Sequence, residues 1–135
     1  EAHEYAQLMH ETGLCSIWLV APTTPEERVK SIVRNGSGFI YYISREGVTG
    51  MQQEVAASIK DKTSVIRQHT ELPIAVGFGI SNPNQARQVA DCADAVVVGS
   101  AIVNQIAEHG AGNNLAGHVA GYVKTLVDAV RPPIS

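Results

Sequence analysis

The chain has 135 residues, of which 44% are hydrophobic and 17% charged, and its formal net charge is −3 at pH 7. This composition is typical of a single globular domain and excludes a disordered tail. The slight excess of acidic residues provides no electrostatic footprint for a polyanion, so we expect no nucleic-acid partner.

The two cysteines, Cys15 and Cys92, are far apart in the sequence. Neither has a second thiol nearby, so the sequence predicts neither a disulfide framework nor a metal site. The apolar runs are far shorter than the roughly 18 residues that a membrane span needs, and no basic-then-apolar leader opens the sequence. We therefore expect a cytoplasmic protein that has no membrane contact.

The first residues, Glu1–Glu11, already form a helical pattern, which Gly13 is expected to end. No initiator methionine and no capping residue precede this pattern. We therefore expect the sequence to be a piece of a longer protein. The alternative is a true domain boundary left after removal of a tag.

Four short apolar runs are rich in β-branched or aromatic residues, and turn residues and then a helical pattern follow each of them. They are Ser16–Ala21, Gly38–Ile43, Pro73–Gly77 and Asp94–Gly99. This alternation predicts βαβ units and a parallel sheet. The runs are continuously apolar, which is typical of strands covered on both faces.

The segments that follow these runs show helical periodicity. The expected helices are Pro25–Asn35, Met51–His69, Pro83–Ala90, Ala101–His109 and Leu115–Val130. Thr24 and Thr49 are each predicted to cap a helix through a capping box, and Ser81-Asn82-Pro83 marks a third start. No linker or repeat divides the chain, so we expect residues 1–135 to form one continuous, partial domain.

Ligands of parallel α/β folds bind at the loops that follow the carboxyl ends of the strands. Three of these loops are rich in glycine: Ser44–Gly50, Gly77–Ser81 and Gly99–Ile102. Backbone N–H groups in such loops, together with the N-termini of the helices that follow, favour an anion. The residues predicted to form a phosphate site are Gly50, Gly79, Gly99 and Ser100. The alternative is that these glycines only make tight turns.

Three further residues are candidates for the walls of the same pocket. Thr49 either reaches into the site or serves only as a helix cap. Tyr41 and Tyr42 point to opposite faces of one strand, and we expect Tyr41 on the pocket side. Phe78 lies at a strand end, where its ring contacts either a flat apolar substrate or the core.

Catalytic residues are harder to find. General acid–base chemistry calls for two carboxylates in different environments on the ligand face. Glu46 is the only acid in the three glycine-rich loops, while Glu71 and Asp94 lie at the amino ends of strands, and the histidines fall in helices or at their ends. The sequence therefore predicts a binding half without catalytic residues of its own.

At these loops the sequence resembles the α subunit of tryptophan synthase, a (β/α)8 barrel that cleaves indole-3-glycerol phosphate to indole and glyceraldehyde 3-phosphate. Ser44–Gly50 is similar to that family's sixth-loop motif, S-R-x-G-V-T-G. Gly77–Ser81 resembles its seventh-strand signature and Gly99–Val103 its eighth. The resemblance runs over the whole chain and implies an α/β fold, the carboxyl-terminal half of a TIM barrel with parallel strands five to eight.

The resemblance also implies roles for single residues. Those expected to bind the substrate phosphate are Gly50, Gly79, Gly99 and Ser100. Thr49 would belong to the closing lid, Tyr41 would approach the glycerol portion of the substrate and Phe78 would line the indole pocket. The family's two catalytic carboxylates belong to the second strand and the loop after it, so none is expected in this segment.

For the parent subunit the resemblance implies no metal and no organic cofactor. Its partner would be the β subunit, which uses pyridoxal phosphate and receives indole, in an α2β2 heterotetramer. Two other interpretations stay open: a non-catalytic phosphosugar-binding half-barrel and an open flavodoxin-like domain. A half-barrel has unpaired outer strands and an exposed apolar interior face, so we expect the isolated chain to associate and to lack lyase activity.

Overall fold

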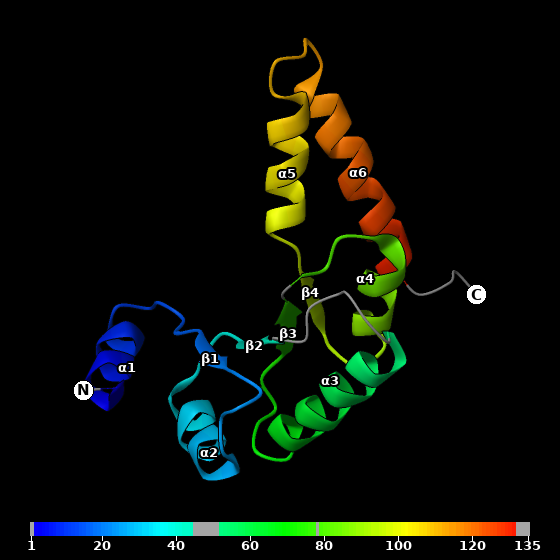
Figure 1. The fold of residues 1–135 in the computed structure, drawn as a ribbon. Helices are drawn as coiled ribbons and strands as arrows, with labels where there is room; N and C mark the ends of the chain where they lie inside the picture. Colours follow the sequence, from blue (N-terminus) through cyan, green and yellow to red (C-terminus); the bar gives the residue numbers. More distant parts are fainter. Residues whose placement is uncertain (1, 45–51, 78, 132–135) are drawn as a thin grey trace.

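The structure, a computed structural model, describes residues 2–44, 52–77 and 79–131 (Figure 1). Its elements are α1 (Ala2–Glu11), β1 (Trp18–Val20), α2 (Glu26–Asn35), β2 (Ile40–Ile43), α3 (Gln52–Arg67), β3 (Ile74–Gly77), α4 (Pro83–Ala90), β4 (Ala95–Val97), α5 (Ser100–His109) and α6 (Leu115–Val130). The predicted alternation of strands and helices is confirmed. The strands are shorter than the apolar runs that predicted them. At Ser16, for example, the backbone N–H donates to the hydroxyl of Ser37 at 3.0 Å and not to a neighbouring strand.

The four strands form one parallel sheet in the order β1-β2-β3-β4. Each helical crossover therefore leads to the adjacent strand, as in a barrel. A flavodoxin-like sheet reverses its strand order at a switch point and carries helices on both faces. The sequential order rules out that alternative.

One face of the sheet carries the core. Its fully buried strand residues alternate along the strands: Val20, Ile40, Tyr42, Ile74 and Val76. They pack against buried residues of the helices α2, α3, α4 and α6, namely Val29, Val33, Ile59, Ile66, Ala86, Val89 and Leu126. The helices α2, α3, α4 and α6 therefore cover the same face of the sheet.

The opposite face is only partly covered. Leu19 of β1 is 53% exposed and Ile17, just before it, is 46% exposed. The expectation that both faces of every strand are covered is thus wrong for this chain, whereas the expected exposed apolar face is present. Four strands are half of the eight that close a barrel of this type, so this face corresponds to an open interior.

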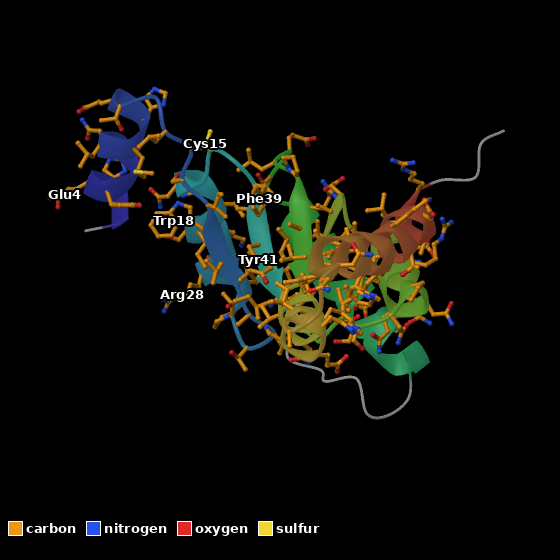
Figure 2. The ribbon with its side chains drawn as sticks, turned by 90° about the horizontal axis from the view of Figure 1, so that it is seen from above. Glu4, Cys15, Trp18, Arg28, Phe39 and Tyr41 are labelled. Carbon is orange, nitrogen blue, oxygen red and sulfur yellow. The ribbon has the colours of Figure 1, made fainter. Side chains whose placement is uncertain are left out.

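Helix α1 lies at the β1 end of the sheet (Figures 1 and 2). Gly13 ends it as predicted, with a φ of +71° and bonds from Gly13 N to His10 O and from Leu14 N to Met9 O. The ring of Tyr5 meets Trp18 edge to face at a centroid distance of 6.1 Å. Its contact with Trp18 thus holds α1 against β1.

The helix starts were only partly predictable. Asn82 caps α4 as expected, since its side chain accepts a hydrogen bond from Gln85 N at 3.0 Å and Pro83 follows. Thr24 does not cap α2. Its hydroxyl accepts from Ala21 N at 3.0 Å, and Pro25 takes the N-cap position without a side-chain bond. Thr49, the other predicted cap, lies outside the described residues.

The helices α5 and α6 form an antiparallel pair beyond β4 (Figure 1). The helix α6 also packs closely on α4. Across the described part of the chain, no helix has the length and apolar character needed to cross a bilayer. The carboxyl ends of the strands form one edge of the sheet, here called the carboxyl edge. The segment that leads from β3 to α4 and the start of α5 both lie at this edge.

Candidate functional site

The carboxyl ends of three strands lie side by side. Ile43 of β2 pairs with Gly77 of β3, and Gly77 pairs with Val97 of β4. These residues end their strands, so the three glycine-rich loops leave the sheet next to one another. The predicted meeting of these loops at one edge is confirmed for the points where they begin.

Three of the predicted phosphate-binding residues lie within the described residues. Gly79 is half-buried and has a φ of +69°, a left-handed conformation that glycine adopts without strain. Gly99 is the N-cap of α5 and is exposed, and Ser100 is the first residue of that helix. Thr49, Gly50 and Phe78 lie outside the described residues, so their predicted roles stay predictions.

The N-terminus of α5 is open. Among the residues that the structure describes, no side chain caps it at Gly99 and no atom lies within 4 Å of a Cβ built on Gly99. The first N–H groups of a helix have no intrahelical partners, and the helix dipole adds positive potential there. This end of α5 therefore presents free N–H donors to an anion, and no side chain of the described residues occupies the space beside Gly99.

Tyr41 and Tyr42 occupy opposite faces of β2, as predicted. Tyr42 is 1% exposed on the helix-covered face. The hydroxyl oxygen of Tyr41 lies on the other face, 2.7 Å from where a Cβ of Gly77 would be. Figure 2 shows Tyr41 on β2, within the sheet. Contact between Tyr41 and a substrate stays a prediction.

Side chains from two helices hold the loop that carries Gly79. The backbone N–H of Ser81 donates to Oε1 of Gln85 at 2.8 Å, and its carbonyl oxygen accepts from the Tyr122 hydroxyl at 2.9 Å. Burial raises the pKa of Tyr122 above its ordinary value of 10.0. A tyrosine hydroxyl is protonated at neutral pH even without that shift, so it is available as a donor. Helical periodicity predicted the helix Leu115–Val130 that carries Tyr122, but no local signal in the sequence marks a bond across 41 residues.

Asp94 lies at the amino end of β4, away from this edge. Its Oδ2 accepts from Ile74 N at 2.8 Å and from the Arg67 guanidinium at 2.6 Å. The bond from Ile74 and the nearby Arg67 hold the pKa of Asp94 below its ordinary value of 3.8. This carboxylate ties β3 to β4, as its position before a strand suggested. The described segments contain no cluster of three side chains suited to a metal ion.

Cys15 and Cys92 are both free thiols. Cys92 is half-buried and donates to the carbonyl oxygen of Val89 at 3.4 Å, and burial raises the pKa of its thiol. A raised pKa disfavours the nucleophilic thiolate. Neither cysteine adds a reactive group to the carboxyl edge of the sheet.

Comparisons with known proteins agree with this architecture. The family model described as tryptophan synthase alpha chain matches residues 1–130. The tryptophan synthase alpha chain of Opitutus terrae is 54% identical over 109 residues, which are 81% of this chain and 41% of that protein. The alpha chain of Phenylobacterium zucineum is 44% identical over 132 residues, which are 97% of this chain and 48% of that protein.

A solved structure gives the same result. Tryptophan synthase subunit alpha from Campylobacter jejuni is 34% identical, with a TM-score of 0.79 over 93% of this chain and 49% of that chain. The chain thus spans about half the length of the curated relatives that it matches. Its parallel sheet of four strands is half of their α/β barrel. On the family match and these identities, the chain belongs to the tryptophan synthase α chain family.

Proposed function

We propose that this chain is the carboxyl-terminal, phosphate-binding half of a tryptophan synthase α subunit, a carbon–carbon lyase. The parent reaction is the retro-aldol cleavage of indole-3-glycerol phosphate to indole and glyceraldehyde 3-phosphate. One observation carries the proposal: Ile43, Gly77 and Val97 end three neighbouring strands in a row, and the three glycine-rich loops start there.

The phosphate would lie between the loop of Gly79 and the N-terminus of α5. Backbone amides at Gly79, Gly99 and Ser100, with Gly50 of the preceding loop, would donate to its oxygens, and the exposed Ser100 hydroxyl would add a further donor. A dianion at a helix N-terminus is stabilised by both the free N–H groups and the dipole. The half-barrel thus supplies a fixed anchor for one end of the substrate.

The remaining contacts of the substrate would extend along the open face of the sheet. Tyr41 would approach the glycerol portion, Phe78 would line the indole pocket and Thr49 would close over the ligand. Fixing the phosphate aligns the scissile carbon–carbon bond with catalytic groups, which lowers the entropic cost of reaction.

The chemical step would need carboxylates from outside this sequence. One would transfer a proton at the indole ring and the other would assist at the glycerol hydroxyl, so that the bond between ring and glycerol breaks. This chain's own residues bind and orient. The subunit would need no cofactor, and the indole would pass to a β subunit that holds pyridoxal phosphate, in a cytoplasmic α2β2 assembly.

Binding of glycerol 3-phosphate tests the proposal. The protein is a complete barrel, made by joining residues 1–135 to the amino-terminal half of the Phenylobacterium zucineum relative, and calorimetry gives the dissociation constant. Ser100→Ala removes one hydroxyl donor and should weaken binding about three- to tenfold. Gly79→Leu places a bulky side chain where the backbone must approach the phosphate and should weaken binding at least about tenfold.

The matched control is Gly121→Ala on α6, where an added Cβ would meet no atom within 4 Å. Its affinity for glycerol 3-phosphate should equal that of the unchanged barrel. Unchanged affinity in both Ser100→Ala and Gly79→Leu would refute the proposed phosphate site. Binding without indole release in the completed barrel would favour the phosphosugar-binding alternative.

A further inference from the structure

Both backbone polar groups of Ser81 are bonded by side chains from different helices. Gln85 of α4 accepts from its N–H at 2.8 Å, and Tyr122 of α6 donates to its carbonyl oxygen at 2.9 Å. Ser81 itself is exposed and belongs to neither helix. Water could satisfy the same N–H and C=O in an exposed loop. The bonds to Gln85 and Tyr122 instead tie the two peptide groups on either side of Ser81 to two helices, which fixes their position.

Ser81, which these two bonds hold, lies two residues beyond Gly79. Between them, Ile80 is 6% exposed and belongs to the helix-covered core. Gly79 has a φ of +69° and Asn82 caps α4 immediately afterwards. The short segment Gly79–Asn82 is therefore held in place by a core side chain, two side-chain bonds and a helix cap, so its backbone has little freedom left.

The bond from Tyr122 links this loop to the last helix of the chain. The helix α6 packs on α4, as Figure 1 shows, and Ala86 of α4 and Leu126 of α6 both belong to the buried core. Tyr122 lies one turn before Leu126 on the same side of α6. The packing that buries Leu126 therefore also fixes the position of the Tyr122 hydroxyl relative to the loop that contains Ser81. The position of α6 thus determines where the Ser81 carbonyl is held.

We propose that Tyr122 and Gln85 are positioning residues for the phosphate site: they hold the two peptide groups that flank Ser81 so that the backbone N–H at Gly79 points at the phosphate. The inference rests on the proposed function. Neither side chain touches the substrate. Their effect is to prearrange a donor that would otherwise have to be ordered on binding, which costs affinity.

The experiment compares Tyr122→Phe, Gln85→Met and the double variant in the complete barrel described above. Tyr122→Phe removes only the hydroxyl, and Gln85→Met removes the acceptor while preserving chain length and helix propensity. Each single variant should bind glycerol 3-phosphate about threefold more weakly. In the indole-release assay KM should rise by the same factor while kcat stays within about twofold, because the lost binding is uniform.

A merely structural role would lower the melting temperature without this split between KM and kcat. Hydrogen exchange supplies the second readout: the Ser81 amide should exchange faster in Gln85→Met and the loop 79–82 faster in both variants. The two substitutions act on the two peptide groups that flank one residue, Ser81, so the loss of affinity in the double variant should differ from the product of the two single losses.

The matched control is Tyr5→Phe, which removes a tyrosine hydroxyl on α1, at the β1 end of the sheet. It should change neither affinity nor exchange in the loop. If the unchanged barrel binds no glycerol 3-phosphate, the proposed function itself fails. If it binds, and Tyr122→Phe and Gln85→Met bind equally well with unchanged loop exchange, the positioning role alone is refuted.

Discussion

The hydroxyl of Tyr41 lies directly over Gly77. A Cβ on Gly77 would come within 2.7 Å of the Tyr41 oxygen and within 2.8 Å of the Cβ of Val97. Gly77 is thus required for space rather than for an unusual φ. Its missing side chain lets residues from both neighbouring strands close over the end of β3, on the face away from the helices.

Gly77→Ala should therefore destabilise the protein. Overpacking of this kind costs about 1–3 kcal/mol, and thermal or urea unfolding at a fixed protein concentration measures it. Tyr41→Phe in the same background removes one of the three contacts at 3.0 Å or less, the others being with Cβ and the carbonyl oxygen of Val97, and should restore part of the lost stability. Gly121→Ala, with no atom within 4 Å of the added Cβ, should instead be neutral or stabilise α6 by up to about 1 kcal/mol. Equal stability of Gly77→Ala and the unchanged chain would show that Tyr41 lies elsewhere.

Asp94 should make stability depend on pH at the acid end. Its folded-state pKa lies below 3.8, so its contribution is complete above that value and is lost as pH falls through the folded-state pKa. Asp94→Asn should cost about 0.5–1 kcal/mol at pH 7, since the pair with Arg67 is partly exposed. The difference in the free energy of unfolding between the unchanged protein and Asp94→Asn should shrink below about pH 4.

Urea unfolding of both proteins, from pH 7 down to the lowest pH at which they remain folded, measures this pH dependence of stability. Asp128→Asn is the control, because that carboxylate pairs with Lys124 one turn away in α6 and both side chains are exposed. It should cost less than about 0.5 kcal/mol. A loss of stability in Asp94→Asn that is the same at every pH would contradict the claim that the charged form of Asp94 links β3 to β4.

Asn82→Ala should remove the N-cap of α4. The lost bond to Gln85 N is expected to cost about 1 kcal/mol in the free energy of unfolding, whereas Asn82→Asp should retain most of it. Thr24→Ala provides a comparison, because Thr24 was expected to be a cap and is not one. It removes a bond within the turn before α2, so it should leave the helix start at Glu26 unchanged. Hydrogen exchange distinguishes the two variants: it should become faster in the first turn of α4 in Asn82→Ala and stay unchanged in the first turn of α2 in Thr24→Ala.

Local patterns predicted most of this fold. The continuous apolar runs and the turn residues between them marked the strands and helices to within a few residues, and Asn82-Pro83 marked a helix start. Thr24 shows where such patterns stop being informative: its sequence fits a capping box, yet the adjacent Ala21 N–H competes for the same oxygen. Which donor wins depends on how the chain leaves β1, and the local sequence does not encode that path.

The positions of several candidate site residues could be predicted from the sequence, but the tertiary contacts that hold them in place could not. Glycine-rich loops predicted that Gly79, Gly99 and Ser100 would lie near the ends of neighbouring strands, and strand alternation predicted that Tyr41 and Tyr42 would lie on opposite faces; the structure has both arrangements. The bond from Tyr122 to Ser81 and the close approach of Tyr41 to Gly77 are tertiary contacts. They depend on how α6 packs on α4 and on the register of β2 and β3, neither of which has a local signal.

The isolated 135-residue chain should not stay monomeric. Leu19 is 53% exposed on the open face, and the outer edges of β1 and β4 are unpaired in the four-stranded sheet. Exposed strand edges beside an apolar face favour strand addition. Sedimentation velocity should show dimers or larger species, and the addition of the missing half-barrel should shift them to a compact 1:1 complex. A stable monomer at micromolar concentration would contradict the open half-barrel.

Indole release measures the central claim most directly. The chain is incubated with indole-3-glycerol phosphate, first alone and then with the amino-terminal half of the Phenylobacterium zucineum relative supplied as a separate polypeptide, and indole is quantified. We predict no release above background from the chain alone and clear release once the second half brings the catalytic carboxylates. Release of indole by the 135-residue chain unaided would contradict both the half-barrel and the placement of the catalytic groups outside it.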